Sequence, residues 1–246
     1  MSLLTIVTGA LGRMGLPTTA TVVGNTTRTV VEMLALLQQE GRELSRRAAW
    51  KVLQRETTFT TVAAAAQTDA AALPSDLDWI LPETMFNRTL NRQVDGPLSP
   101  GEWQQIQSAL VTRVNPAFRI RGTSLLLSPT PAAGDTIAYE YVTNKWCQSS
   151  GGTAQTAWTA DSDTALVDEE LHTLGLIWRF KFMKGLPSWE EAAGLYDLQV
   201  RQAITREGVR SRLSSDPVWD RNGSDVIAAA RGNVILSSDG DSMGWD

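Results

Sequence analysis

The spacing of the apolar residues changes twice along this chain of 246 residues. Up to residue 55, and again after residue 162, apolar side chains recur every three or four positions, which is the period of an amphipathic helix. Between these regions, short runs of β-branched and aromatic residues are separated by Gly, Pro and Asp, a pattern typical of strands and turns. The sequence therefore predicts an α+β fold: a helical bundle of N- and C-terminal helices with an inserted antiparallel β-rich region and an extended C-terminal arm.

Four regions follow from this pattern. Residues 1–55 hold N-terminal helices and residues 163–212 a helical hairpin, and together they are predicted to form one helical domain. Residues 56–162 form the β-rich insert. Residues 213–246 lose all hydrophobic period and are rich in Asp, Ser and Gly. They indicate an extended arm that is ordered mainly by contact with other chains.

The N-terminal region predicts two helices. The first covers residues 2–12, with Ser2 as its N-cap. The second follows a helical period over residues 27–54, in which Gly41 marks either a close helix crossing or a break between two helices. The apolar face of the first helix is Leu3, Ile6, Val7, Ala10 and Leu11, and that of the second includes Val30, Leu34, Leu37, Leu44, Ala48 and Val52.

The β-rich insert contains three segments with strand character at residues 118–122, 124–129 and 136–142. Their connections are tight, so an antiparallel meander is predicted. Upstream, residues 56–62 are β-prone, while residues 63–74 show no clear period and are predicted to be a turn or loop. The insert also predicts a short helix to about Val111, with Ser99 as N-cap and Pro100 at the first helical position, and a polar loop over residues 142–161 that pairs at most at its edges.

A helical hairpin is predicted after residue 162. Its first helix covers residues 163–184, with Asp163 as N-cap, and Gly185 ends it. Ser188 and Glu191 have the spacing of a capping box, so a second, antiparallel helix begins at Trp189 and runs to about Arg212. The apolar stripe of the first helix is Val167, Leu171, Leu174, Trp178 and Phe182, widened by Leu176, Ile177, Phe180 and Met183.

Composition and charge argue against several functional classes. The net charge of −5 argues against a general nucleic-acid binder. There is no run of about 18 apolar residues, so no membrane span is predicted, and the N-terminus lacks the basic start of a signal peptide. Cys147 is the only cysteine, so an intrachain disulfide is impossible.

The two ends of the chain carry opposite charge. Residues 1–55 hold seven basic and three acidic side chains, a net +4, whereas residues 213–246 hold two basic and six acidic ones, a net −4. In a ring of identical subunits, these ends can meet between neighbours. The alternative is that the tail is acidic only for solubility.

Three patterns suggest catalysis, each with a simpler explanation. Gly9, Gly12 and Gly15 resemble the dinucleotide-binding turn of a reductase, but the segment that follows is helical rather than a strand. Glu169 and Glu170 offer the paired carboxylates of a wall-degrading enzyme, although helix N-terminal charge also explains them. The single histidine, His172, has no partner for a metal site and is predicted to be packed, like an inert Cys147 thiol. We predict no enzyme, no cofactor and no metal site; a carbohydrate-binding β module with helical flanks is a further alternative.

Several sequence blocks occur together in a characteristic order: GRELSRRAAWKVLQRETTFTTV, LPETMFNRTLNRQVDGPLSPGEWQ, FRIRGTSLLLSPTPAAGDTIAYEYV and DTALVDEELHTLGLIWRFKFMKGL. By these blocks the chain resembles the adaptor, or head-to-tail connector, proteins of tailed bacteriophages over roughly residues 1–212. The resemblance implies a structural protein of the virion, made in the host cytoplasm and placed at the head–tail junction. It implies a ring, expected to be twelve-fold, that binds the portal protein, extends the DNA channel and offers a docking surface for tail or nozzle proteins.

The same resemblance implies that double-stranded DNA passes through the lumen without sequence-specific binding, and that no membrane is involved. Bulky apolar residues in the arm are then expected to anchor it to the portal or a neighbouring subunit. A basic stripe on the second helix is either a solvated face or a further partner surface. The predicted interface residues are Trp219, Val226, Ile227, Val234, Ile235, Leu236 and Trp245 in the arm, and Arg42, Arg46 and Arg47 on the helix.

Overall fold

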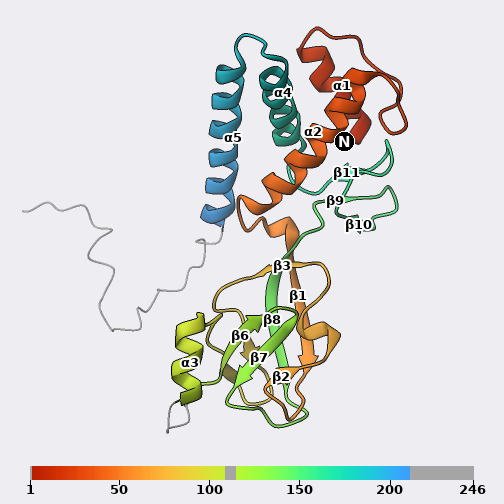
Figure 1. Ribbon diagram of the computed structural model, residues 1–246. Coiled ribbons are helices and arrows are strands. Elements are labelled where there is room, and N and C mark those ends of the chain that lie inside the picture. The colour runs from red at the N-terminus through yellow and green to blue at the C-terminus, as the bar shows by residue number, and fades with distance from the viewer. Residues whose placement is uncertain (1, 109–114, 211–246) are drawn as a thin grey trace, which may run out of the picture. The chain divides into compact units, whose positions relative to one another are not determined.

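The computed structural model describes residues 2–108 and 115–210, with helices at both ends of the described chain and strands between them (Figure 1). The predicted α+β class is therefore confirmed. Residues Met1–Glu207 form one unit and Gly208–Asp246 a second. The predicted arm lies outside the described residues, and the division into domains at residues 55, 162 and 212 stays a prediction.

Helix α1 (Leu3–Arg13) confirms the first predicted helix. Ser2 has extended backbone geometry, and its hydroxyl accepts a hydrogen bond from the Thr5 N–H, so it caps the helix as expected. The apolar face is completely buried, and it consists of Leu3, Ile6, Val7, Ala10 and Leu11.

Helix α2 (Arg28–Arg46) ends well before the predicted residue 54. A short 3₁₀ helix, η1 (Lys51–Leu53), follows it, and Val52 there is exposed rather than part of the apolar stripe. The helix continues through Gly41, which is neither a break nor a helix crossing. A Cβ at this position would lie 2.3 Å from the Trp146 ring, so glycine is what admits the indole.

Helix α4 (Glu169–Lys184) begins later than predicted. Its N-cap is Asp168, which accepts from the Glu170 N–H. The Asp163 carboxylate instead accepts from the N–H groups of Thr159 and Ala160, which holds the preceding turn. The predicted stripe was also too long, because Phe182 and Met183 are exposed and Trp178 is half-buried; the buried apolar residues of α4 are Leu171, Leu176, Ile177 and Phe180.

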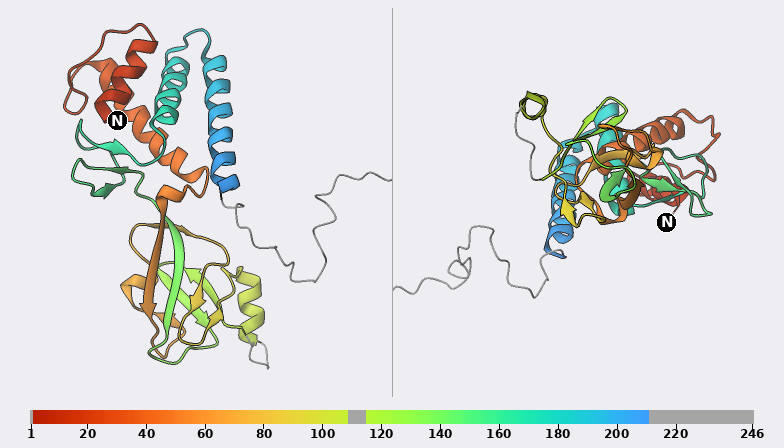
Figure 2. Two further views of the ribbon diagram at one scale, coloured as in Figure 1. Left: turned by 180° about the vertical axis from the view of Figure 1, so that it is seen from behind. Right: turned by 90° about the horizontal axis from the view of Figure 1, so that it is seen from below.

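Helix α5 (Trp189–Arg210) begins where the sequence predicts and runs antiparallel beside α4 (Figures 1 and 2). Gly185 has the left-handed geometry expected of the residue that ends α4, with φ of 61°. The predicted capping box is wrong, because Ser188 also has a positive φ of 61°, whereas a capping residue is extended.

The central strand of the larger sheet is β8 (Thr136–Thr143). It pairs antiparallel with β1 (Gln54–Thr60), with β3 (Leu77–Ile80) and with β4 (Phe86–Asn87), which in turn pairs with β5 (Arg92–Gln93). The β1–β8 register, which sets Gln54 opposite Val142, joins segments far apart in the sequence.

A second sheet contains β6 (Ala117–Arg121), β7 (Ser124–Ser128) and β2 (Ala66–Gln67) in the order β2-β7-β6. The β6–β7 hairpin is confirmed, but the predicted meander is wrong because β8 belongs to the other sheet. The segment after β7 bonds to Thr61 instead of folding back: the Gly134 N–H donates to the Thr61 carbonyl, and the Thr61 hydroxyl to the Ala132 carbonyl.

Segments predicted as loops also contain short elements. Residues 63–74 include β2 and the 3₁₀ helix η2 (Ala70–Ala72), whereas the loop after β8 contributes β9 (Cys147–Gln148) and β10 (Ala154–Gln155) to a third sheet with β11 (Thr164–Ala165). Helix α3 (Pro100–Ser108) begins as predicted. Ser99 and Glu102 exchange the reciprocal bonds of a capping box. The predicted end near Val111 lies outside the described residues.

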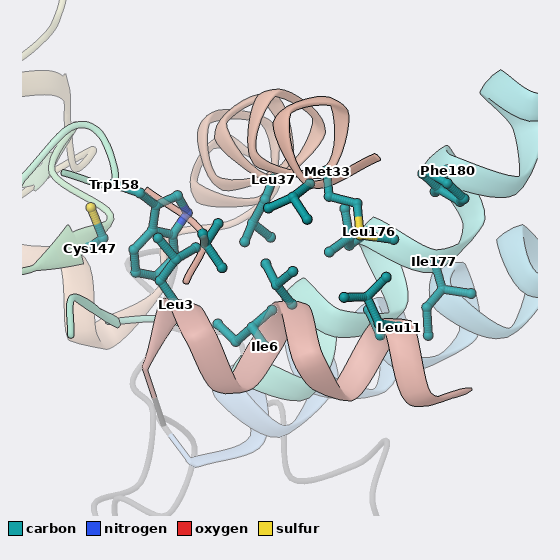
Figure 3. Close-up of a cluster of buried hydrophobic side chains, with 14 of the residues drawn as sticks. Leu3, Ile6, Leu11, Met33, Leu37, Cys147, Trp158, Leu176, Ile177 and Phe180 are labelled. Carbon is teal, nitrogen blue, oxygen red and sulfur yellow. The ribbon is translucent and has the colours of Figure 1, made fainter. Parts of the chain in front are cut away.

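Buried apolar residues gather in three clusters. The first joins α1, α2 and α4 to side chains from the predicted insert, namely Trp146, Cys147 and Trp158 (Figure 3). The second lies among the strands, around Phe118 and Tyr139. The third contains Leu44, Trp50, Leu53, Val142, Val167, Leu171, Tyr196 and Val200.

Candidate interaction surfaces

The predicted interface residues of the arm lie outside the described residues, whereas the predicted arginines do not. Arg42 and Arg46 lie on the last turns of α2, Arg47 is its C-cap, and all three side chains are exposed. The structure gives them different surroundings.

Arg47 holds helices together. Its guanidinium lies 3.4 Å from the Asp197 carboxylate and over the ring of Tyr196, 5.1 Å from the centroid. Both partners belong to α5. The side chain therefore has a structural partner on each side, and a docking role for it is less direct than the sequence suggested.

Arg46 and Arg42 are held more loosely. Arg46 pairs with Asp78 of β3 at 3.5 Å, but its side chain is 68% exposed, so the pair contributes little. Arg42 has no ion-pair partner within the described part of the chain. These two arginines keep donors available for another molecule.

Beside them lies a pocket of about 170 Å³, which we call the basic pocket. Two buried polar atoms belong to residues that line it: the amide oxygen of Asn144 and the indole nitrogen of Trp146. Neither has a hydrogen-bond partner among the described residues. A buried polar group without a partner costs about 1–3 kcal/mol. The pocket is lined by Arg42, Ser45, Arg46, Asn144, Trp146 and Thr156.

A fully partnered ionic network lies among α2, α4 and α5. Glu40 is completely buried, and it accepts a 2.6 Å bond from the Arg179 guanidinium and a further bond from the Tyr196 hydroxyl. Arg179 also donates to Glu43 at 2.6 Å. Gly175 makes room for Glu40, because a Cβ there would lie 2.3 Å from the Glu40 side chain. Burial and the neighbouring Glu40 raise the pKa of Tyr196.

A second buried polar group, His172, is packed against Trp146 and Trp158, with ring centroids 6.1 and 6.2 Å away. Neither imidazole nitrogen has a hydrogen-bond partner among the described residues. Burial lowers the pKa of His172 from 6.5 to about 4, so the ring is neutral at pH 7. The sequence-based interpretation of His172 as a packed side chain agrees with this geometry.

Cys147 is also unsuited to chemistry. Burial, with the Asp163 carboxylate, raises the pKa of its thiol to about 12, so the reactive thiolate is scarce at neutral pH. No group of three or more His, Cys, Asp or Glu side chains suited to a metal ion occurs within residues 2–108 and 115–210.

One protein-family model matches a range that includes all the described residues. Residues 1–222 match the model of the SU10 adaptor protein family. The chain belongs to this family. Its members are adaptor proteins of tailed phages, as the sequence resemblance implied. No curated protein matches the chain.

In this SU10-family adaptor, the patterns that suggested catalysis have structural roles. Gly9 and Gly12 lie inside α1, and Gly15 follows its C-cap. The three glycines therefore lie at the end of a helix and do not connect a strand to a helix. The Glu170 carboxylate accepts two bonds, of 2.5 and 2.8 Å, from Arg13 at the end of α1.

Large apolar side chains are also exposed on both helices of the adaptor's C-terminal hairpin and in the turn between them, and we call this set of residues the hairpin surface. Phe182 is 58% exposed, and the α5 residues Leu195 and Leu198 are about half exposed. Sequence reasoning assigned Phe182 to the core because its spacing fits the buried stripe. Exposed apolar side chains that gather in a patch commonly mark protein-binding surfaces. The hairpin surface comprises Phe182, Met183, Leu186, Leu195 and Leu198.

None of the described helices is long and apolar enough to cross a membrane.

Proposed function

We propose that this adaptor forms a ring, expected to be twelve-fold, beneath the portal protein at the head–tail junction of a phage virion. The ring connects the capsid to the tail and extends the channel through which double-stranded DNA passes without sequence-specific binding. Its partners are the portal, tail or nozzle proteins and other copies of the chain. The role is structural, with no enzymatic activity, cofactor or membrane.

The observation that carries this proposal is the family match over residues 1–222. The described surfaces support it. A closed ring of identical subunits needs two different surfaces on each chain, because head-to-tail contacts are heterologous. The hairpin surface is apolar and the basic pocket is charged, so the chain offers surfaces of two kinds. The net charge of −5 suits a channel that must not hold DNA phosphates.

The arm, residues 213–246, is proposed to bind the portal or a neighbouring subunit. Its tryptophans, Trp219 and Trp245, are the bulky residues that commonly anchor a segment in a partner's pocket. The aliphatic residues assigned to the same contact are Val226, Ile227, Val234, Ile235 and Leu236.

The test of the ring is the mass of the full-length protein alone and mixed with portal protein, measured by native mass spectrometry. A monomer that becomes a closed ring only with portal supports the proposal. A small oligomer that is indifferent to portal contradicts it. Addition of NAD(P)H serves as a control for the reductase alternative and should leave the thermal midpoint unchanged.

A truncated chain tests the arm. Deletion of residues 214–246 should abolish assembly on portal-containing heads while the far-ultraviolet circular dichroism of the helices is retained. A full-length Trp219→Ala/Trp245→Ala variant, which keeps the arm's length and charge, should weaken assembly through loss of the anchors alone. Stable connectors formed by the truncated chain would contradict the arm's proposed role.

A further inference from the structure

We propose that the basic pocket binds the acidic segment 237–246 of a neighbouring copy of this chain. The inference rests on the proposed ring and names a contact that closes it. Its basis is the set of donors and acceptors around the pocket, together with the charge of that segment.

The residues that line the pocket offer both donors and an acceptor of hydrogen bonds. Arg42 and Arg46 are donors, whereas the Asn144 side chain carries an amide oxygen that has no partner among the described residues. A simple anion or a DNA phosphate offers only acceptors and would leave Asn144 unsatisfied. A peptide with carboxylate side chains satisfies both kinds of atom, because its backbone N–H groups donate.

The size of the pocket agrees with a peptide. Its volume of about 170 Å³ is below the roughly 300 Å³ at which sites for drug-sized ligands begin. One or two short side chains with their backbone fit such a space, whereas a folded element does not. Arg46 already pairs with Asp78 at 3.5 Å, so an entering carboxylate shares or replaces that partner, whereas Arg42 has no ion pair among the described residues.

Segment 237–246, SSDGDSMGWD, has the matching composition. It contains Asp239, Asp241 and Asp246 and no lysine or arginine. The other stretches outside the described residues, 109–114 and 211–236, all contain arginine. Because each copy carries one pocket and one such segment, binding between neighbours is head-to-tail and closes a ring.

A peptide of sequence SSDGDSMGWD with a fluorescent label tests the contact directly. The receptor is the full-length chain with Asp239, Asp241 and Asp246 changed to Asn, so that its own segment does not compete. Arg42→Glu/Arg46→Glu in this receptor should weaken binding about tenfold or more, and binding should fall as salt is raised. Arg28→Glu, a single charge reversal at the other end of α2, should leave the affinity unchanged.

A peptide with all three aspartates replaced by asparagine is the matched ligand control and should bind much more weakly. Equal binding of both peptides, or equal binding to the double variant, would overturn the inference. Arg42→Gln, which removes no ion pair, provides a milder variant should the double charge reversal disturb folding.

Complementation between two full-length variants tests whether the contact is between copies. One variant has the Arg42→Glu/Arg46→Glu pocket and an intact segment, and the other an intact pocket and the asparagine segment. Each alone should fail to form the contact, whereas their mixture should associate, as measured by native mass spectrometry. If the mixture gains nothing over either variant alone, the contact is within one chain and the inference is wrong.

Assembly on portal-containing heads separates this inference from the ring itself. Rings formed normally by the pocket variant, together with no peptide binding, would refute the pocket contact and leave the ring intact. Peptide binding without any portal-dependent ring would refute the proposed function and leave the contact. A pocket variant that loses assembly, although the asparagine-segment receptor with the intact pocket does not bind the peptide, would make the portal or tail protein the occupant instead and would also overturn the inference.

Discussion

The ionic network around Glu40 and the aromatic cluster around His172 solve the same problem in opposite ways. Both bury a polar side chain completely, Glu40 of α2 and His172 of α4. The Glu40 carboxylate is bonded to the Arg179 guanidinium and the Tyr196 hydroxyl. His172 packs against the rings of Trp146 and Trp158, has no hydrogen-bond partner among the described residues, and remains neutral at pH 7 because burial lowers its pKa to about 4. Loss of a partner should therefore strongly destabilise the first arrangement, whereas protonation should destabilise the second.

The difference predicts which change each cluster tolerates. The ionic network joins three helices, because Glu40 and Glu43 of α2 accept bonds from Arg179 of α4, and Glu40 also accepts one from Tyr196 of α5. The aromatic cluster is not held by paired charges. Its stability depends on packing and, through the protonation of His172, on pH. The following changes separate the two, from the largest expected effect to the smallest.

Removal of Arg179 should have the largest effect. Arg179→Met leaves the Glu40 carboxylate buried without its cation, so the free energy of unfolding should fall by about 3–5 kcal/mol. Urea denaturation at pH 7 measures it. Glu40→Met in the same background removes the stranded charge and should recover part of the loss. If the free energy of unfolding of Arg179→Met lies within about 1 kcal/mol of wild type, the buried Glu40 does not depend on Arg179.

The second-largest loss of stability is expected from acid, which acts on the aromatic cluster. The folded pKa of His172, about 4, lies below its unfolded value of 6.5. Its stabilising contribution is therefore complete above pH 6.5 and is lost as the pH falls toward 4. Relative to His172→Phe, wild type should lose about 2–3 kcal/mol of unfolding free energy between pH 7 and pH 4.5. Parallel pH profiles for the two proteins would show that His172 titrates normally.

Glycine-to-alanine substitutions test whether each cluster has space for an added methyl group. Gly175→Ala places a Cβ against the Glu40 side chain and Gly41→Ala places one against Trp146, both at 2.3 Å. Each should lower the free energy of unfolding by about 1–3 kcal/mol. Gly194→Ala on α5 meets nothing within 4 Å and should instead raise it by up to about 1 kcal/mol. Thermal or urea unfolding of all three variants makes the comparison.

The exposed pair between Arg13 and Glu170 should matter least. Both side chains are about half exposed, so solvent and salt screen their attraction. Arg13→Gln should lower the free energy of unfolding by less than about 1 kcal/mol, with a smaller loss at high salt. A loss as large as that of Arg179→Met would show that exposure does not govern the strength of these pairs.

Local patterns in the sequence predicted the local elements. Helix α1 with its Ser2 cap, the Ser99 cap of α3 and the β6–β7 hairpin all depend on neighbours within a few residues. The error at Asp163 has the same origin, because an aspartate before an apolar run suits a helix start and the turn it actually holds equally well. Local propensity does not separate these two uses.

Contacts between distant residues account for what was missed. Nothing near Glu40 in the sequence indicates that Arg179, 139 residues later, will bond to it. Phe182 has the spacing of the buried stripe. It is nevertheless exposed, because it lies near the C-terminal end of α4, beyond the part that neighbouring elements cover. Of the predicted arginines, only the fold shows that Arg47 is held by α5 while Arg42 and Arg46 border a pocket. The predicted residues of the arm remain untested.

The pairing of β8 has a consequence for synthesis of the chain on the ribosome. Strands β1, β3 and β4 all precede β8, and none of the three pairs with another of them within the described residues. Their exposed edges must wait until residues 136–143 have left the exit tunnel, and helix α2 must wait still longer for Arg179. Such long waits for distant partners favour slow folding and aggregation. The nascent adaptor is therefore expected to depend on chaperones most while its first half is complete and its second half is still being translated.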